Sequence, residues 1–150
     1  DRLVSCSDDG TIRMWSLEDY ECKEFIPVAA HAEADEDKCN VNCVCVAGDR
    51  LYAGVGSSVL MWDLKEGEEP NASQAYHGHT DEVRMVLVTE DGHVLSCSDD
   101  CTVKAWSQET QHCINTFGKH ESEVFCMCRD GRALYSGEQD GQIFRWDWTP

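Results

Sequence analysis

Histidine, serine and aspartate recur together along this chain at similar spacing, and these are the residues of a hydrolytic triad. His79, Ser96 and Asp100 form one set, and His120, Ser136 and Asp140 form another. A tryptophan closes each set, however, and a triad has no use for an indole. The Gly-x-Ser-x-Gly turn that presents the serine of many hydrolases is also missing. We therefore predict that the sets brace the fold and that the chain is not an enzyme.

Ten cysteines suggest a second chemistry, either zinc binding or disulfides. Their spacing favours neither, since no Cys-x-x-Cys pair and no spaced Cys/His quartet occurs. Cys43 and Cys45, like Cys126 and Cys128, are two residues apart, which places each pair on one face of a strand. We expect the cysteines to fill the core as small apolar residues, with metal, redox and disulfide roles as lesser alternatives. This predicts no metal or other cofactor and a location inside the cell, in the cytoplasm or nucleus.

A repeat supplies the elements that must position these residues. Four segments of the chain align with one another, and each ends in a tryptophan: Leu3–Trp15, Leu51–Trp62, Val94–Trp106 and Ala133–Trp146. The tryptophans return every 40 to 47 residues. Periods of about 40–45 residues with four strands each are typical of propeller blades.

Each segment has the local chemistry of a β-hairpin. Asp9-Gly10 and Asp140-Gly141 suit tight turns because these residues tolerate positive φ, and β-branched and aromatic residues follow them. We expect inner strands before the hairpins and outer strands behind them, at Val41–Val46, Val83–Thr89, Val124–Arg129, Tyr20–Pro27 and Gln111–Phe117. No stretch of about ten residues has a convincing helical period, so the predicted class is all-β.

These features resemble the WD-repeat (WD40) β-propeller family, whose blades carry Gly-His near one end and Trp-Asp near the other. Gly78-His79, Trp62-Asp63 and Trp146-Asp147 match those motifs, and the resemblance covers nearly the whole chain. It implies about four WD-type blades, partial at both ends, at approximately 1–27, 28–70, 71–117 and 118–150. The blades would form a portion of a seven- or eight-bladed ring. The chain opens inside a strand without Met, and we take it as an excerpt of a longer protein.

The resemblance also implies a hydrogen-bonded structural tetrad in each blade. Its members would be His79, Ser96, Asp100 and Trp106, then His120, Ser136, Asp140 and Trp146, and in the first, partial blade Ser5, Asp9 and Trp15. A buried carboxylate needs several donors, and a relay of imidazole, hydroxyl and indole provides them. The second blade departs from the pattern, because Tyr52 and Gly56 stand where we align the serine and the aspartate. Its histidine would be His31, followed by an acidic insertion at 32–38 that is either a solvated loop or a contact for a basic partner.

The formal net charge of −17 restricts the partners. Binding to phosphate groups needs clustered Lys and Arg, so we expect neither a nucleic acid nor a membrane surface as a partner. No apolar run approaches the roughly 18 residues of a membrane helix. A basic peptide would be attracted, although the acidic loops could also serve solubility alone.

Family partners often meet the propeller face that carries the start of each inner strand and the residue before the turn aspartate. By position these residues are Asn42, Val44, Arg84, Val86, Phe125 and Met127, together with Asp8, Val55, Asp99 and Gln139. Arg, Phe and Met are residue types that anchor interfaces, although Val44, Val86 and Met127 could instead pack between blades.

Two functions from different classes follow. The first is a scaffold or adaptor that binds a peptide or protein partner within a multi-protein complex, of which a ubiquitin-ligase substrate receptor is one form. The alternative is a purely architectural segment of a large cytoskeletal, ciliary or RNA-processing assembly. In both cases unpaired strand edges would require the rest of the propeller, or a second chain, to close the ring.

Overall fold

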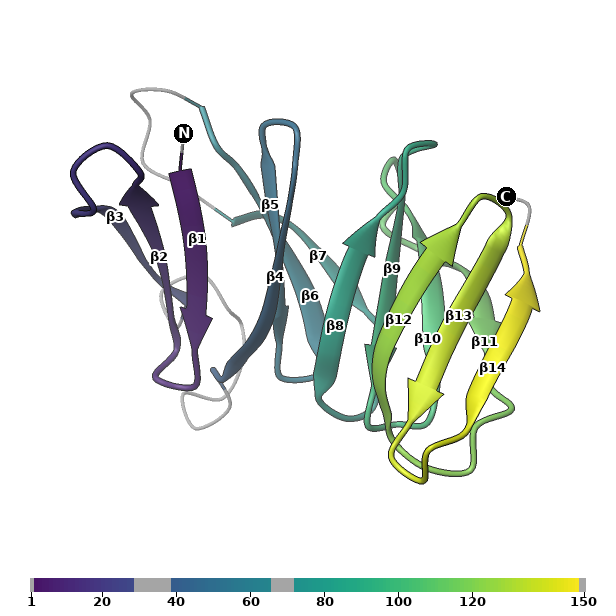
Figure 1. The fold of residues 1–150 in the computed structure, drawn as a ribbon. Helices are drawn as coiled ribbons and strands as arrows, with labels where there is room; N and C mark the ends of the chain where they lie inside the picture. Colours follow the sequence, from purple (N-terminus) through teal and green to yellow (C-terminus); the bar gives the residue numbers. More distant parts are fainter. Residues whose placement is uncertain (1, 29–38, 66–71, 149–150) are drawn as a thin grey trace.

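Four antiparallel sheets stand side by side in the computed structural model, which describes residues 2–28, 39–65 and 72–148. The strands of each sheet follow one another in chain order (Figure 1). Their bounds are β1 (Arg2–Ser7), β2 (Thr11–Ser16) and β3 (Cys22–Pro27); β4 (Val41–Ala47), β5 (Arg50–Val55), β6 (Ser58–Asp63) and β7 (Ala72–His77); β8 (Val83–Val88), β9 (His93–Ser98), β10 (Val103–Ser107) and β11 (Cys113–Phe117); and β12 (Val124–Asp130), β13 (Ala133–Glu138) and β14 (Ile143–Asp147).

The all-β partial propeller is confirmed, with three, four, four and three strands in its successive sheets. The row of inner strands runs through β1, β4, β8 and β12, and each contacts the next (Figure 1). His31 and the acidic insertion 32–38 lie outside the described residues.

The outer strands begin two residues later than expected, at Cys22 and Cys113. Tyr20 and Gln111 have φ of 60° and 59°, and their N–H groups donate to the carbonyls of Ser16 and Ser107. A left-handed residue closes the turn before the strand starts, so these two residues belong to turns.

The core lies between the sheets, in three clusters. One joins the first and second sheets around Ile12 and Leu51, one joins the second and third around Tyr52 and Trp106, and one joins the third and fourth around Leu95 and Leu134. All six of these side chains are fully buried. Each sheet is therefore stabilised by its immediate neighbours, as expected of stacked repeats.

The cysteines only partly fill the core. No disulfide joins any of the ten, all of which lie within the described ranges, and Cys97 is buried. Cys43 of the second sheet lies against the backbone of the third sheet, and burial raises the pKa of its thiol to about 12. The expectation is wrong for four cysteines, which are exposed. Cys22 and Cys113 begin the outer strands β3 and β11, and Cys126 and Cys128 lie on the last described sheet.

The register of the second sheet corrects one alignment. Ala53 pairs with Leu60 of the next strand, as Ser96 pairs with Lys104 in the third sheet. Ala53, rather than Tyr52, therefore occupies the serine position. The shift arises because the β5–β6 turn, between Val55 and Ser58, is one residue shorter than the β1–β2 turn. With alanine there, the second sheet has no hydroxyl for a tetrad.

Candidate functional site

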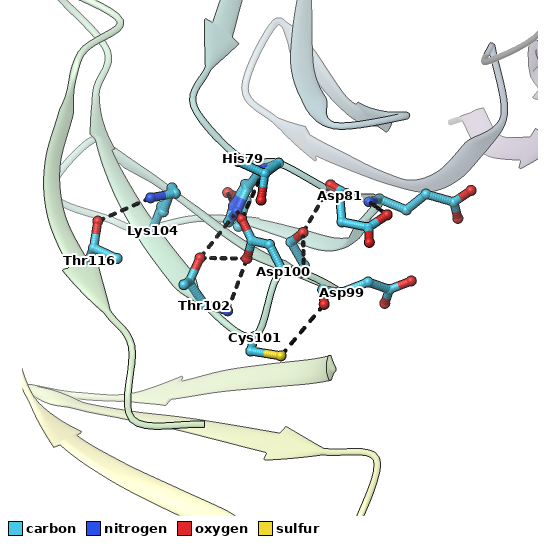
Figure 2. A network of polar contacts seen from close by, with 12 residues as sticks. His79, Asp81, Asp99, Asp100, Cys101, Thr102, Lys104 and Thr116 are labelled. Carbon is cyan, nitrogen blue, oxygen red and sulfur yellow. Dashed lines mark hydrogen bonds and ion pairs between the residues drawn. The ribbon is translucent and has the colours of Figure 1, made fainter. Parts of the chain in front are cut away.

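The third sheet brings its four expected tetrad residues together as a relay. Trp106 Nε1 donates to Ser96 Oγ at 2.8 Å, and Ser96 Oγ lies 2.7 Å from Nε2 of His79. Nδ1 of His79 lies 2.7 Å from the Asp100 carboxylate (Figure 2). If Ser96 donates to Nε2, the Nδ1 proton of His79 points at Asp100, and every polar group is satisfied.

A threonine completes the third sheet's relay. Thr102 Oγ1 donates to Asp100 at 2.6 Å, and the Thr102 N–H donates to the same oxygen at 3.0 Å (Figure 2). The Thr80 N–H donates to the other oxygen at 3.1 Å. Burial raises the pKa of Asp100, but the bonds from Thr102 and His79 outweigh it and lower this pKa overall. Burial in turn lowers the pKa of His79, despite the opposing effect of Asp100. Asp100 is thus held ionised beside a neutral imidazole.

The first sheet holds the corresponding half of the relay. Trp15 Nε1 donates to Ser5 Oγ at 2.9 Å, and Thr11 donates to Asp9 through both its hydroxyl, at 2.6 Å, and its N–H, at 3.1 Å. The same Asp-x-Thr arrangement therefore fixes the turn carboxylate in both the first and third sheets.

The fourth sheet lacks the expected carboxylate contact, which corrects the assignment of Asp140. Ser136 Oγ lies 2.7 Å from Nε2 of His120 and accepts the Trp146 indole proton at 2.7 Å, as in the third sheet. Asp140 is exposed, however, and Nδ1 of His120 is buried without a hydrogen-bond partner among the described residues. Gln142 stands where Thr102 stands in the third sheet and offers no hydroxyl to hold the carboxylate.

Asn42, Arg84 and Phe125, three of the residues predicted to bind a partner, share one backbone feature. Each lies where the pairing of an inner strand shifts register, between Val41 and Cys43, between Val83 and Met85, and between Val124 and Cys126. Such β-bulges leave one residue unpaired and re-aim its side chain. The fold therefore presents one side chain per inner strand at the same end of three successive sheets.

Polar contacts join these bulge residues across the sheets. Asn42 Nδ2 donates to Glu82 Oε2 at 3.4 Å, and Glu82 Oε2 lies 3.3 Å from the Arg84 guanidinium. Arg84 also donates two hydrogen bonds to the Asp99 carboxylate, from Nε to Oδ1 at 2.8 Å and from Nη2 to Oδ2. Its Cζ lies 5.8 Å from the centre of the Phe125 ring. We call these residues, with Gln139, the bulge surface.

Backbone hydrogen bonds bring the hairpin turns beside the bulges. The N–H of Asp99 donates to the Glu82 carbonyl at 3.0 Å, and the N–H of Gln139 donates to the Glu123 carbonyl at 2.9 Å. Gln139 is exposed, and Asp8 lies exposed at the corresponding turn of the first sheet.

Met127 does not lie on the bulge surface. Only 3% of it is exposed, and it packs in the cluster between the third and fourth sheets, where its N–H donates to Met85 Sδ at 3.3 Å. Met127 therefore packs between blades, which was the alternative to partner binding. With Met85 and Arg129, Met127 also lines an open cavity of about 530 Å³ near the other end of the inner strands.

Three contributors were not foreseen. Glu82 links Asn42 to Arg84, while Thr11 and Thr102 hold the turn carboxylates. A threonine two residues after the turn aspartate is visible in the sequence and distinguishes the two sheets that hold the carboxylate from the fourth. Glu82, one residue before an inner strand, carries no comparable signal.

No group of three or more His, Cys, Asp or Glu side chains that could hold a metal ion occurs within residues 2–28, 39–65 and 72–148. No helix in that part of the chain is long and apolar enough to cross a membrane.

Sheets stacked around a row of inner strands define the class as a β-propeller, and comparisons with known proteins give the family. A model described as "WD domain, G-beta repeat" matches residues 1–16, 71–107 and 111–147, so the chain belongs to the WD-repeat family. The WD40 β-propeller domain of Doa1 superposes with a TM-score of 0.79 at 19% identity, over 96% of this chain and 45% of that domain's chain.

Two relatives from plants match this chain over only part of their own length. Autophagy-related protein 16 of Arabidopsis thaliana is 31% identical over 65% of this chain and 19% of its own length. The guanine nucleotide-binding protein subunit beta of Zea mays is 25% identical over 97% of this chain and 41% of its own length. The chain thus spans less than half of these relatives. Propellers of this family generally mediate interactions between proteins and are generally non-enzymatic.

Proposed function

We propose that this chain is a protein-interaction scaffold and that the bulge surface is where its partner, a peptide or a folded protein, binds. The observation that carries the proposal is the repeated bulge, which presents Asn42, Arg84 and Phe125 at the same end of three adjoining sheets. Asn42 and Arg84 are half-buried and Phe125 is exposed, so the repeated position reaches the surface of a rigid frame, where binding residues are commonly carried.

The geometry of the bulge surface suits an interaction hot spot. Phe125 is 45% exposed although it is a large apolar residue, and Arg84 lies over its ring. The two carboxylates bound to Arg84 hold its guanidinium in one orientation, so a partner pays little entropy to order it. Aromatic and arginine side chains held this way carry much of the energy at interfaces.

Charge supports a basic partner. Of the six residues of the bulge surface, Glu82 and Asp99 are acidic and Arg84 alone is basic, and the whole chain carries a formal net charge of −17. A partner with Lys and Arg would be steered toward such a surface, more weakly as salt rises. Residence in the cytoplasm or nucleus and membership of a multi-protein complex, including a ubiquitin-ligase receptor, belong to this proposal.

The test compares two triple variants. The first replaces Arg84, Asp99 and Phe125 with alanine, and the control replaces Arg13, Glu24 and Phe25. The control also removes an arginine, a carboxylate and a phenylalanine, here from the first sheet, where Arg13 Cζ lies 5.7 Å from the centre of the Phe25 ring. Partners recovered from cells with the unchanged chain are purified, and their affinities for all three proteins are measured.

Loss of hot-spot residues predicts an affinity at least about 30-fold weaker for the first variant, with unchanged melting temperature. The control should bind like the unchanged chain. Equal affinity of both variants for every recovered partner would favour the purely architectural alternative and overturn the assignment of the bulge surface.

A further inference from the structure

Sulfur atoms of one sheet meet backbone N–H groups on the free edge of the next sheet's inner strand. Between the third and fourth sheets, the Met127 N–H donates to Met85 Sδ at 3.3 Å. Between the second and third sheets, burial raises the pKa of the Cys45 thiol, and a backbone hydrogen bond from Val88 partly offsets this rise. Only a donor stabilises a thiolate, so the Val88 group that meets the Cys45 sulfur is its N–H.

At one place in this pattern a leucine replaces the sulfur. The pairing register places Leu87 of β8 where Cys45 stands in β4. It also places Arg129 of β12 where Val88 stands in β8. Backbone N–H groups two residues apart on a strand point to the same edge, so the Arg129 N–H points away from β13, as the Met127 N–H does. Leu87 offers this N–H no acceptor.

The open cavity of about 530 Å³ lies at this place, where β8 and β12 run side by side (Figure 1). Its lining includes Leu87 and Val88 of β8, and Met127, Cys128 and Arg129 of β12. Consecutive side chains alternate between the two faces of a strand, so a cavity that touches three in a row follows the edge of that strand. The other edge of β12 pairs with β13, so the Arg129 N–H points toward the cavity. Cys128 is exposed, so the cavity opens to solvent there.

We propose that this cavity binds a methionine side chain of a partner protein, with its thioether sulfur accepting the Arg129 N–H. The lining of the cavity supplies the precedent, because Met85 Sδ accepts the neighbouring Met127 N–H. The site goes beyond the proposed function, since it lies near the other end of the inner strands from the bulge surface and does not depend on it.

The walls of the cavity select a neutral, apolar group that carries one acceptor. Met85 and Met127 are apolar lining residues, while Glu90, Asp91 and Arg129 are charged. Arg129 Nη1 lies 2.8 Å from Asp91 Oδ1, which pairs these two charges and leaves Glu90 to repel a carboxylate. A side-chain amide would bring N–H donors that apolar walls leave unpaired. A thioether is flexible, polarisable and a weak acceptor, so it suits both the walls and the single N–H.

The experiment titrates the 150-residue chain with the peptide acetyl-Ala-Met-Ala-amide and follows NMR resonances of the cavity lining. Saturable binding should shift the methyl resonances of Met85 and Met127 and move the Arg129 amide proton downfield, as a new hydrogen bond does. The norleucine peptide has a similar shape without sulfur. It should bind at least about threefold more weakly, as expected of one lost hydrogen bond, and leave the Arg129 proton unmoved. The glutamate peptide should not bind.

Leu87→Met should fill the cavity from within, because its own thioether lies beside the Arg129 N–H. The variant should show the downfield Arg129 shift before any peptide is added. It should bind the methionine peptide at least about tenfold more weakly, since an intramolecular group competes at high effective concentration. Leu60→Met is the matched control, a buried leucine between the first and second sheets, and should bind as the unchanged chain does. If Leu87→Met lowers the melting temperature, Leu87→Cys replaces it and should show the same Arg129 shift, as Cys45 meets Val88.

No saturable shift, or full binding of the methionine peptide by Leu87→Met, would overturn the methionine site. Equal affinities and equal Arg129 shifts with the methionine and norleucine peptides would overturn it too, and would mean a merely apolar pocket. The triple variant at Arg84, Asp99 and Phe125 should bind the methionine peptide as the unchanged chain does. Loss of peptide binding in that variant would move the peptide to the bulge surface and also overturn the cavity site. Loss of the partner alone there would leave both proposals standing.

Discussion

At the scale of single residues, the Asp100 carboxylate is the group on which the third sheet's polar relay depends. It accepts hydrogen bonds from His79, from the Thr80 backbone and from two groups of Thr102. Asp100→Ala leaves these donors unpaired in a buried place and should cost about 2–4 kcal/mol of unfolding free energy. Urea denaturation of the variant and of the unchanged chain measures this difference.

Asp140→Ala is the matched control for Asp100→Ala. Asp140 occupies the same position of the repeat, but its side chain is exposed. We expect its replacement to change the unfolding free energy by less than about 0.5 kcal/mol, as at ordinary surface sites. Equal losses in the two variants would mean that the hydrogen bonds to Asp100 contribute nothing beyond the removal of a turn aspartate.

The buried histidines give the stability a pH dependence of known sign. Burial lowers the folded-state pKa of both His79 and His120 below the unfolded value near 6.5. The contribution of these groups is therefore fully present above about pH 6.5. It is lost as the pH falls through the lowered folded values, because the unfolded chain takes up protons first.

We expect the unfolding free energy to fall between pH 7.5 and pH 5, and His79→Gln to reduce that slope. Urea denaturation at half-unit pH steps measures both, and comparing slopes removes any constant loss caused by the substitution. An unchanged slope in His79→Gln would contradict the assignment of a lowered pKa to the buried His79.

The sequence predicts the role of a residue correctly where that role depends only on the repeat pattern, and less well where a further side chain is needed. Ser and Trp meet in both the third and the fourth sheets because the hairpin register brings them together, and the His before each inner strand contacts the same Ser. The position of the carboxylate needs a further group, and Asp100 and Asp140 differ in whether Thr102 or Gln142 follows. Met127 could not be assigned from its type, since methionine is common both in cores and at interfaces.

At the scale of elements, the second and third sheets approach so closely that one position admits only glycine. A Cβ added at Gly54 would lie 2.7 Å from Cys43 Sγ, 2.9 Å from Val83 Cγ1 and 3.0 Å from the Val83 carbonyl oxygen. The carbonyl belongs to the backbone of β8 and cannot turn aside. Gly54→Ala should therefore cost about 1–3 kcal/mol, as overpacking does.

Gly118→Ala is the control for this prediction, because the nearest atom to its added Cβ is Thr102 Cγ2 at 3.9 Å, an ordinary contact. Thermal or urea unfolding of both variants gives the comparison. A Gly54→Ala variant as stable as Gly118→Ala would show that the two sheets can separate slightly at no cost.

Elements were predicted well where turns and alternation agree, and less well where a turn changed length. The three inner strands that were predicted, β4, β8 and β12, lie within a residue of their predicted bounds at either end. The second hairpin was misaligned by one residue because its turn is shorter, and a shift of one residue exchanges the two faces of a strand. Bulges were not foreseen, because they depend on pairing between strands rather than on local composition.

At the scale of the whole molecule, the four described sheets form a one-dimensional stack, with the first and the fourth sheets at its two ends. Each of the three core clusters joins one pair of neighbouring sheets, so the first and fourth sheets are each supported on one side. Large apolar side chains remain exposed on both, among them Leu3 at 56%, Phe25 at 53% and Ile143 at 77%. Within the described residues these end sheets therefore carry exposed apolar surface of the kind that promotes association.

This arrangement predicts self-association of the 150-residue chain that grows with salt. The end sheets attract one another through apolar surface and unpaired strand edges, while the net charge of −17 keeps copies apart at low ionic strength. Sedimentation velocity over a wide concentration range should show larger species at 1 M than at 0.05 M sodium chloride.

Ile143→Lys should suppress this association, because it places a charge on β14, the edge strand of the three-stranded fourth sheet. Ile114→Lys is the matched control, since Ile114 is 49% exposed on β11, the outer strand of a complete four-stranded sheet. Monomers under all conditions, or equal suppression by both variants, would mean that the three-stranded fourth sheet promotes association no more than the four-stranded third sheet does. Any self-association of the chain would then need an explanation other than the exposed apolar surface of its end sheets.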